Sequence, residues 1–410
     1  MWRKDAGVHT MRAMIKRGLR GLLLALFVVA DFVSPCGATP PPVLIGLDAE
    51  FGHRTSTSAV AIRQGILLAL EEINAAGGVL EGRKLELVER DNRSVPARGE
   101  VNIRELAALP DLVAVFCGKF SPVVQEILPT VHALKIPLLD PWAAMDSLVD
   151  NGYTPNFVFR LSLRDSWAVP TLLEHANHRG LRRLGILAPN TGWGRSSVAA
   201  ARHYASRTGL VDLIGDVGWY NWGDTHLLTP YLALKAGGAQ GILLIANETE
   251  GAILVREVAA LPEGERVPFF SHWGVSGGNF PAMTGEALAA VDFSLVQTFT
   301  FAGTIPARAQ AVLSRLQARF TLGSAATIPS QVGIAHAYDL THILAAAIRQ
   351  AGSTDRQAIR DALESLPAVD GLIRRYDPPF TPNRHEALEP AQVFIGRFSH
   401  EGIVPLAKAD

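Results

Sequence analysis

The stretch INAAGGVLEGRKLELVERDN, residues 73–92, begins as the last turn of a predicted helix and ends as a predicted strand. Gly77 and Gly78 supply the positive-φ positions that end a helix, and the next glycine lies in a tight turn. The strand after that turn ends at Asp91 and Asn92. Because these residue types commonly close a strand through local hydrogen bonds, we interpret both as loop-closing residues rather than as ligand contacts.

The same alternation of helix and strand continues from residue 43 to about residue 400. The predicted strands cover 43–47, 84–90, 111–117, 136–140, 156–163, 183–189, 241–247, 267–273 and 291–301, and a hairpin covers 391–406. This pattern is typical of an α/β fold in which parallel sheets are covered by helices on both faces. A chain of 410 residues is too long for one ordinary core and predicts two compact lobes. Ligands of such sheets bind at the carboxyl ends of the strands.

Composition excludes several classes of protein. The formal net charge of −1 offers no basic face for nucleic acid. Only two cysteines are present, so no disulfide framework is expected. Cys117 lies in the apolar stretch LVAVFCG and is predicted to be a buried thiol rather than a nucleophile.

The first residues have the order of a secretory signal peptide. Basic residues precede the apolar run GLLLALFVVA (21–30), and the small residues CGA (36–38) follow it. The run is too short for a stable membrane span. We therefore expect cleavage and export to the periplasm, with Met11 or Met14 as alternative starts. A lipid anchor on Cys36 and an uncleaved membrane anchor are the alternatives.

Several stretches taken together resemble one family. They include QGILLALEEINAAGGVLEGRKLELVERDN (64–92), FCGKFSPVVQEILP (116–129), FVFRLS (157–162), NTGWGRS (190–196) and AYDLTHILAAAIRQAG (337–352). In this order they are similar to the periplasmic solute-binding proteins of branched-chain-amino-acid-type ABC transporters.

The resemblance implies a type I periplasmic-binding-protein fold with two doubly wound parallel-sheet lobes. It also implies a monomer whose lobes close around a small solute, and delivery of that solute to a membrane permease. It places three crossovers between the lobes near 160–164, 293–300 and 370–376. The implied organisation is a signal peptide at 1–38, lobe one at 39–162 and 296–372, and lobe two at 163–295 and 373–410.

The resemblance also implies a set of ligand-binding positions on loops at the cleft: Ser58, Ser121, Trp142, Ala143, Ala144, Trp193, Glu248 and Trp273. Ser121 opens a predicted helix, where free N–H groups and the helix dipole favour a carboxylate. A simple N-cap is the alternative role for this serine.

Two positions depart from the family pattern. Ala144 replaces the threonine that grips a ligand carboxylate, and His272 and Trp273 stand where an acid pairs with the ligand ammonium. These departures weaken the expectation of an ordinary α-amino acid. The tryptophans at the cleft favour stacking on an aromatic ligand or a cage around a quaternary ammonium. Glu248 is either a compensating charge or a solvated residue at a helix start.

Catalysis has little support in the sequence. No histidine pair has zinc-site spacing with a third ligand, and Ser121 lacks a nucleophile-elbow context. We expect no enzyme activity, no cofactor and no metal. The alternatives are a ligand-sensing receptor domain of the same fold and an exported hydrolase that uses Ser121.

Overall fold

The computed structural model describes residues 40–406, and within this range the chain from Pro42 forms one compact unit. The expected signal peptide, its alternative starts and the proposed lipid anchor at Cys36 lie outside the described residues. Within 40–406, no helix combines the length and the apolar character that a membrane span requires.

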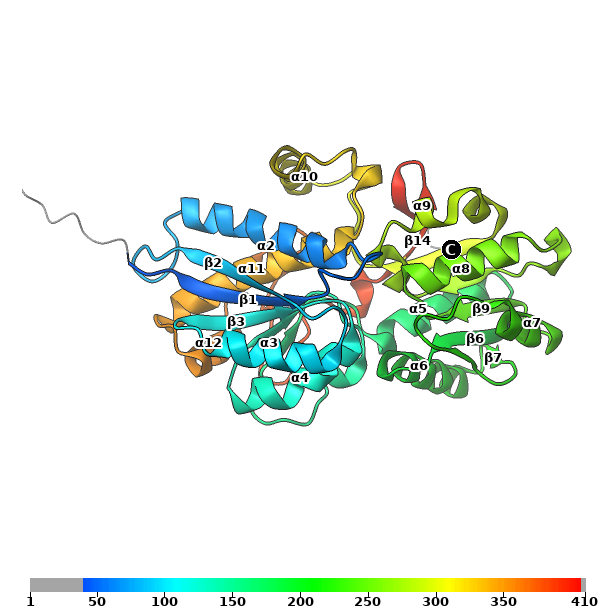
Figure 1. Cartoon of the computed structure of the whole chain (residues 1–410), viewed down its shortest axis with the longest axis horizontal. Coiled ribbons are helices and arrows are strands. Elements are labelled where there is room, and N and C mark those ends of the chain that lie inside the picture. The colour runs from blue at the N-terminus through cyan, green and yellow to red at the C-terminus, as the bar shows by residue number, and fades with distance from the viewer. Residues whose placement is uncertain (1–39, 407–410) are drawn as a thin grey trace, which may run out of the picture. The chain divides into compact units, whose positions relative to one another are not determined.

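The first sheet contains five parallel strands in the order β2-β1-β3-β4-β5. Its strands are β1 (Val43–Ala49), β2 (Leu85–Asp91), β3 (Leu112–Cys117), β4 (Leu138–Asp140) and β5 (Val158–Arg160). Its helices are α2 (Ser58–Ala75), α3 (Pro96–Ala107), α4 (Ser121–Ala133), α10 (Ala307–Phe320), α11 (Gln331–Ala351) and α12 (Arg356–Leu363). Figure 1 shows α2 and α3 on opposite faces of this sheet.

Helices cover both faces of the first sheet, as the apolar strands require. Val43 and Ile45 of β1 are buried in the same core cluster as apolar residues of α2 and α11. Val115 and Cys117 of β3 are buried in a separate cluster with residues of α3 and α4. The thiol of Cys117 is therefore buried, as predicted, and burial raises its pKa.

The second sheet has eight strands in the order β15-β14-β11-β10-β9-β6-β7, with β8 beside β6. Its strands are β6 (Arg183–Pro189), β7 (Asp212–Leu213), β8 (Gly218–Tyr220), β9 (Gly241–Leu244), β10 (Phe269–Ser271), β11 (Phe293–Gln297), β14 (Phe394–Ser399) and β15 (Gly402–Pro405). Its helices are α5 (Asp165–His178), α6 (Gly192–Thr208), α7 (Leu228–Ala236), α8 (Glu248–Ala259) and α9 (Phe280–Thr284). The sheet is parallel except for the terminal hairpin, in which β14 pairs antiparallel with β11 and β15 pairs antiparallel with β14. The predicted α/β class with two doubly wound lobes is confirmed.

The chain crosses between the sheets three times. The first crossing follows β5, and the second follows β11, after which α11 packs on α2 of the first lobe. Before β14 the chain still lies against the first sheet, because Glu386 bridges to Arg160 of β5 and Phe380 contacts Phe159 at 5.1 Å. We therefore propose that the third crossover lies at about 387–393, later than 370–376, and that the return to lobe one extends accordingly.

The stretch at 73–92 forms the predicted helix end, turn and strand. Gly77 and Gly78 have φ of 101° and 71° directly after α2. Asn74 joins the helix to the strand, since its side-chain amide exchanges two hydrogen bonds with the backbone of Leu85. The turn thus returns the chain beside β1 as strand β2.

A glycine sets the close approach of α2 and α11. A Cβ atom at Gly65 would lie 2.2 Å from the carbonyl oxygen of Ile334. We expect Gly65→Ala to force the two helices apart and to lower the free energy of unfolding by about 1–3 kcal/mol. Urea unfolding measures the change, with Gly264→Ala as the control because no atom lies near a Cβ at that position. Equal effects of both substitutions would contradict the close contact.

Candidate ligand-binding site

The carboxyl ends of the strands in both lobes carry most of the candidate residues. In lobe one, Ser121 opens α4 after β3, and Trp142 lies in the loop after β4. In lobe two, Trp193 lies in the first turn of α6 after β6, and Trp273 follows β10. This is the edge at which parallel α/β sheets bind ligands.

Five of the eight candidates line one small cavity. Its volume is about 10 Å³, which is at the lower limit for one water molecule. Its lining residues are Lys119, Phe120, Ser121, Trp142, Ala144, Trp193, Trp222, Asn247, Trp273 and Gly274. Ser58, Ala143 and Glu248 are not among them.

The indole rings themselves occupy the space between these loops. Trp142, Trp193 and Trp273 are 2%, 6% and 1% exposed. The ring centres of Trp142 and Trp273 lie 5.4 Å apart, and Trp193 contacts His272 edge-on at 5.1 Å. A solute the size of an amino acid therefore enters only after the lobes separate or the indoles rotate.

The side chains of Asp140 and Arg160 bind the backbone of the loop that carries Trp142 and fix its conformation. Asp140 Oδ1 accepts hydrogen bonds from the backbone N–H groups of Trp142 at 2.9 Å and of Ala143 at 2.7 Å. Arg160 Nη1 donates to the carbonyl oxygens of Ala143 and Met145 at 3.1 and 2.9 Å. Ala143 thus serves the loop through its backbone. Burial raises the pKa of Asp140 to about 6, against the lowering effect of the Arg160 charge.

Trp193 is held by a residue at the start of α5. Its indole Nε1 donates to Asp165 Oδ1 at 3.2 Å. A Cβ atom at Gly194 would lie 1.9 Å from the carbonyl oxygen of Pro189, so glycine at this position lets the first turn of α6 approach β6. Gly194 therefore helps to position the aromatic ring of its neighbour Trp193 at the cleft.

Two serines differ from expectation in their local roles. Ser121 is the first residue of α4, while Phe120 is the N-cap, so the N-cap interpretation of Ser121 is wrong. The Ser121 hydroxyl instead accepts a hydrogen bond from Met145 N at 3.4 Å. The hydroxyl of Ser58 donates to the carboxylate of Glu50, and Ser58 is fully buried at the start of α2.

Glu248 is buried in an ion pair between the lobes. Its Oε2 lies 2.6 Å from Nζ of Lys119, and the two side chains are 0% and 1% exposed. Burial raises the pKa of Glu248, but the Lys119 charge together with the hydrogen bonds that the carboxylate accepts holds this pKa below its ordinary value. The interpretation of Glu248 as a solvated residue is therefore wrong.

Asp91 and Asn92 serve the loops, as interpreted from the sequence. Asp91 Oδ1 accepts from the backbone N–H groups of Gly52 and Arg93, each at 3.0 Å. The Asn92 amide donates to Asp48 Oδ2 at 3.0 Å. Both residues thus hold loops at the edge of the first sheet.

Asp48 gives the protein a pH-dependent stability. Burial raises its pKa from 3.8 to about 7, against the lowering effect of hydrogen bonds from Asn102 and Asn92. Between these values the folded chain holds a proton that the unfolded chain has lost, so stability falls as pH rises. We expect the wild type to lose up to about 4 kcal/mol relative to Asp48→Asn between about pH 4 and about pH 7. Urea unfolding across this range tests it, and parallel curves would contradict it.

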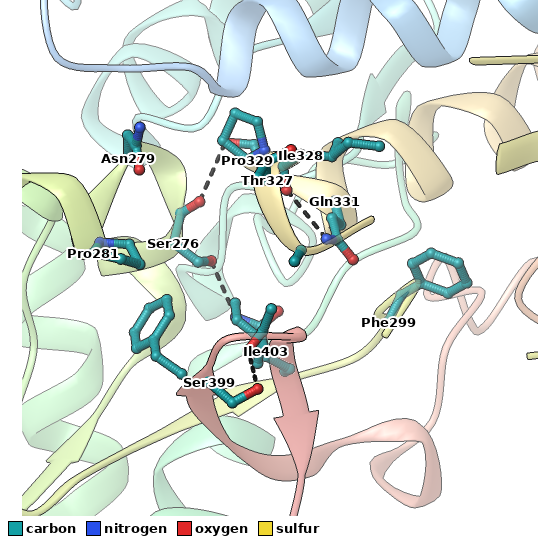
Figure 2. Close-up of a pocket in the computed structure, with 16 residues that line it drawn as sticks. Ser276, Asn279, Pro281, Phe299, Thr327, Ile328, Pro329, Gln331, Ser399 and Ile403 are labelled. Carbon is teal, nitrogen blue, oxygen red and sulfur yellow. Dashed lines mark hydrogen bonds between the residues drawn. The ribbon is translucent and has the colours of Figure 1, made fainter. Parts of the chain in front are cut away.

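The described residues also form pockets larger than the small cavity. An open pocket of about 510 Å³ shares Phe120, Trp222 and Asn247 with it and reaches Glu248. Figure 2 shows a different cavity, of about 230 Å³, between the second crossover and the terminal hairpin. Gln331 in its wall donates to the backbone oxygens of Ala325 and Ile328. The cavity in Figure 2 is lined by none of the eight candidate residues.

Sequence reasoning missed part of the cavity wall. Lys119, Phe120, Trp222 and Asn247 line it but were not singled out as candidates. Lys119 carried a usable signal, because a lone lysine stands inside the apolar stretch FCGKFS at a strand end. The loop of Trp222 follows the short strand β8 and was not among the loops considered.

The family model described as periplasmic binding protein matches residues 43–397. The chain belongs to the periplasmic binding protein family. The expected resemblance to type I binding proteins of the branched-chain amino acid transporter type is thereby confirmed.

Individual relatives of this binding protein are distant. It is 22% identical over 348 residues to Leu/Ile/Val-binding protein homolog 1 of Brucella abortus (strain 2308), covering 84% of this chain and 88% of the relative.

Solved structures show the same fold. A periplasmic binding protein type 1 from Bordetella pertussis Tohama I matches with a TM-score of 0.79 and 22% identity, covering 89% of this chain and all of that one. An R. palustris solute-binding protein in complex with benzoate matches with a TM-score of 0.73 and 16% identity, covering 89% and 95%.

The described residues show no prepared metal site. Between residues 40 and 406, no group of three or more His, Cys, Asp and Glu side chains is placed to share a metal ion. The expectations about metals and cofactors stay predictions.

Proposed function

We propose that this binding protein is the extracytoplasmic receptor of an ABC importer, which closes its two lobes around a small organic solute and passes it to a membrane permease. Family membership and the convergence of five candidate residues at the strand ends of both lobes support this function. We propose that the mature protein is a periplasmic monomer and has no enzyme activity.

The observation that carries the ligand class is the lining of the small cavity. Four tryptophans line it together with Ser121, which lies at the start of α4, and the lining includes no acidic residue. An α-ammonium group needs an anionic partner, because burying an unpaired charge is costly. A carboxylate finds Ser121 and the positive end of a helix. We therefore propose an aromatic carboxylate as the preferred solute, ahead of a cationic head group held by the indoles alone.

Two relatives bear on this choice in opposite directions. The Brucella abortus relative is named for leucine, isoleucine and valine, whereas the R. palustris structure holds benzoate. In this chain Ala144 and Trp273 stand at positions where the family has polar ligand contacts. This difference favours an aromatic carboxylate such as benzoate over leucine, isoleucine or valine. Titration of the mature protein with benzoate, phenylacetate, choline and leucine tests the order of affinities.

Trp193 tests the location of the site. We expect Trp193→Ala to weaken binding of an aromatic carboxylate by about 1–3 kcal/mol, since a stacked ring is lost. Isothermal titration calorimetry measures the loss, and Trp219→Ala is the control because Trp219 is 42% exposed on β8. Micromolar leucine binding that Trp193→Ala and Trp273→Ala both leave unchanged would show that the site is elsewhere.

A further inference from the structure

A lysine of lobe one reaches across to a glutamate of lobe two beside the cavity. Lys119 follows β3 and Glu248 opens α8, and their side chains are almost completely buried. Removing both charges from water is costly, and a buried pair of this kind often stabilises a fold no more than apolar residues of the same size. Its position beside the candidate site calls for another explanation.

The ammonium group of Lys119 lies in a socket that is formed by Glu248, the Gly277 carbonyl and the Phe120 ring. Besides Glu248, the carbonyl oxygen of Gly277 accepts from Nζ at 3.5 Å. The ring centre of Phe120 lies 5.0 Å from Nζ, within the range of a cation–π contact. A Cβ atom at Gly277 would lie 2.7 Å from Nζ, so a side chain at this position would displace the ammonium.

The nearby carboxylates are already committed to other donors. Thr55 Oγ1 donates to Glu248 Oε1 at 3.0 Å, which leaves Oε2 for an ammonium. Glu50 accepts from Ser56 and Ser58, and also from the backbone of Lys119 at 3.3 Å. Glu250 accepts from Gly223 N at 3.2 Å. Glu248 is thus the carboxylate that defines the socket.

We propose that Glu248, the Gly277 carbonyl and the Phe120 ring form a binding subsite for a primary ammonium group, and that Lys119 occupies this subsite in place of a ligand. Because Lys119 also lines the indole cavity, it determines the substrate class by excluding solutes that carry a free ammonium. This inference rests on the proposed function as a solute receptor.

Shortening the lysine should vacate the subsite. Lys119→Ala removes three carbon atoms and the ammonium, which are the heavy atoms of n-propylammonium. We expect the variant to bind n-propylammonium at least about tenfold more tightly than the wild type, where the buried pair must first be broken. Thermal shift and calorimetry on the mature protein, with n-propylammonium chloride as the probe and sodium chloride at equal ionic strength as the reference, measure the difference.

Matched variants separate the subsite from general effects of charge. Lys119→Met fills the space of the lysine side chain with an apolar chain and should not gain n-propylammonium binding. Lys235→Ala breaks the more exposed pair with Glu265 and should not gain it either. The double variant Lys119→Ala/Glu248→Gln should lose the gained affinity because the carboxylate is gone.

A reciprocal variant keeps the test sharp if Lys119→Ala folds poorly. Glu248→Ala removes the heavy atoms of acetate, and acetate should raise its melting temperature but not that of the wild type. Recovery of folded Lys119→Ala only in the presence of n-propylammonium supports the subsite. The inference is overturned if n-propylammonium neither binds to Lys119→Ala nor restores its folding, and acetate does not stabilise Glu248→Ala.

Benzoate titrations of the same proteins separate this inference from the proposed function. Benzoate binding by the wild type together with n-propylammonium binding by Lys119→Ala supports both. Benzoate binding without any gain of n-propylammonium overturns the subsite and leaves the receptor function standing. A gain of n-propylammonium without binding of any aromatic carboxylate supports the subsite and overturns the proposed solute class.

Discussion

Replacing Arg160 with methionine should lower the free energy of unfolding by about 3–5 kcal/mol. Arg160 is completely buried and donates to both carboxylate oxygens of Glu386, at 2.9 and 2.6 Å. The substitution leaves a buried carboxylate without its main partner and frees two carbonyl oxygens of the Trp142 loop. Arg164 lies 3.6 Å from Glu386 and offsets part of the loss.

Denaturant unfolding measures the effect of Arg160→Met. The control is Arg375→Met, because Arg375 pairs with Asp370 on the surface and both side chains are well exposed. Surface pairs contribute about 0–1 kcal/mol, so the control should change little. A loss at Arg160 no larger than at Arg375 would show that the buried pair does not stabilise the region where the last segment joins lobe one.

Trp273→Ala should cost a similar amount, about 3–5 kcal/mol, because it removes a large side chain from a filled space. Trp273 contacts Trp142 at 5.4 Å and His336 at 5.7 Å. The vacated volume has the size of the lost indole, and engineered cavities of this kind bind small molecules that fill them. We therefore expect indole to raise the melting temperature of this variant but not that of the wild type.

The exposed Trp219 again provides a control for Trp273→Ala, with an expected change within about 0.5 kcal/mol. Trp142 and Trp273 belong to different lobes. Trp273→Ala should therefore also lower the free energy needed to separate the two lobes. A loss below about 1 kcal/mol, with no response to indole, would mean that the aromatic pair is not packed as described.

The fold could be predicted because its signals are local. Apolar runs, glycine caps and the alternation of helix and strand act over a few residues, and they predicted both sheets and the return to lobe one. Element ends were less accurate: the predicted strand 156–163 is only Val158–Arg160 in the structure. The third crossover was difficult to place because a short bridge at Glu386, rather than a regular element, holds that segment.

The site was only partly predictable because its charges are paired over long distances in the chain. Ser121, Trp142, Trp193 and Trp273 follow strands, so topology alone brought them together. The partner of Glu248 could not be inferred, since no periodicity relates it to Lys119 in the other lobe. Ser58 has the local environment of a helix start, yet its hydroxyl is bound to Glu50.

The packing of α2 on α11 has a consequence for biosynthesis. α2 ends at Ala75, and its main helical partner does not begin until Gln331, roughly 250 residues later. At a synthesis rate of about 5–20 residues per second, the ribosome needs roughly 10–50 s to supply that partner. Throughout this interval the side of α2 that packs on α11 lacks its native partner, so the nascent chain exposes an apolar helix face and stays incompletely folded.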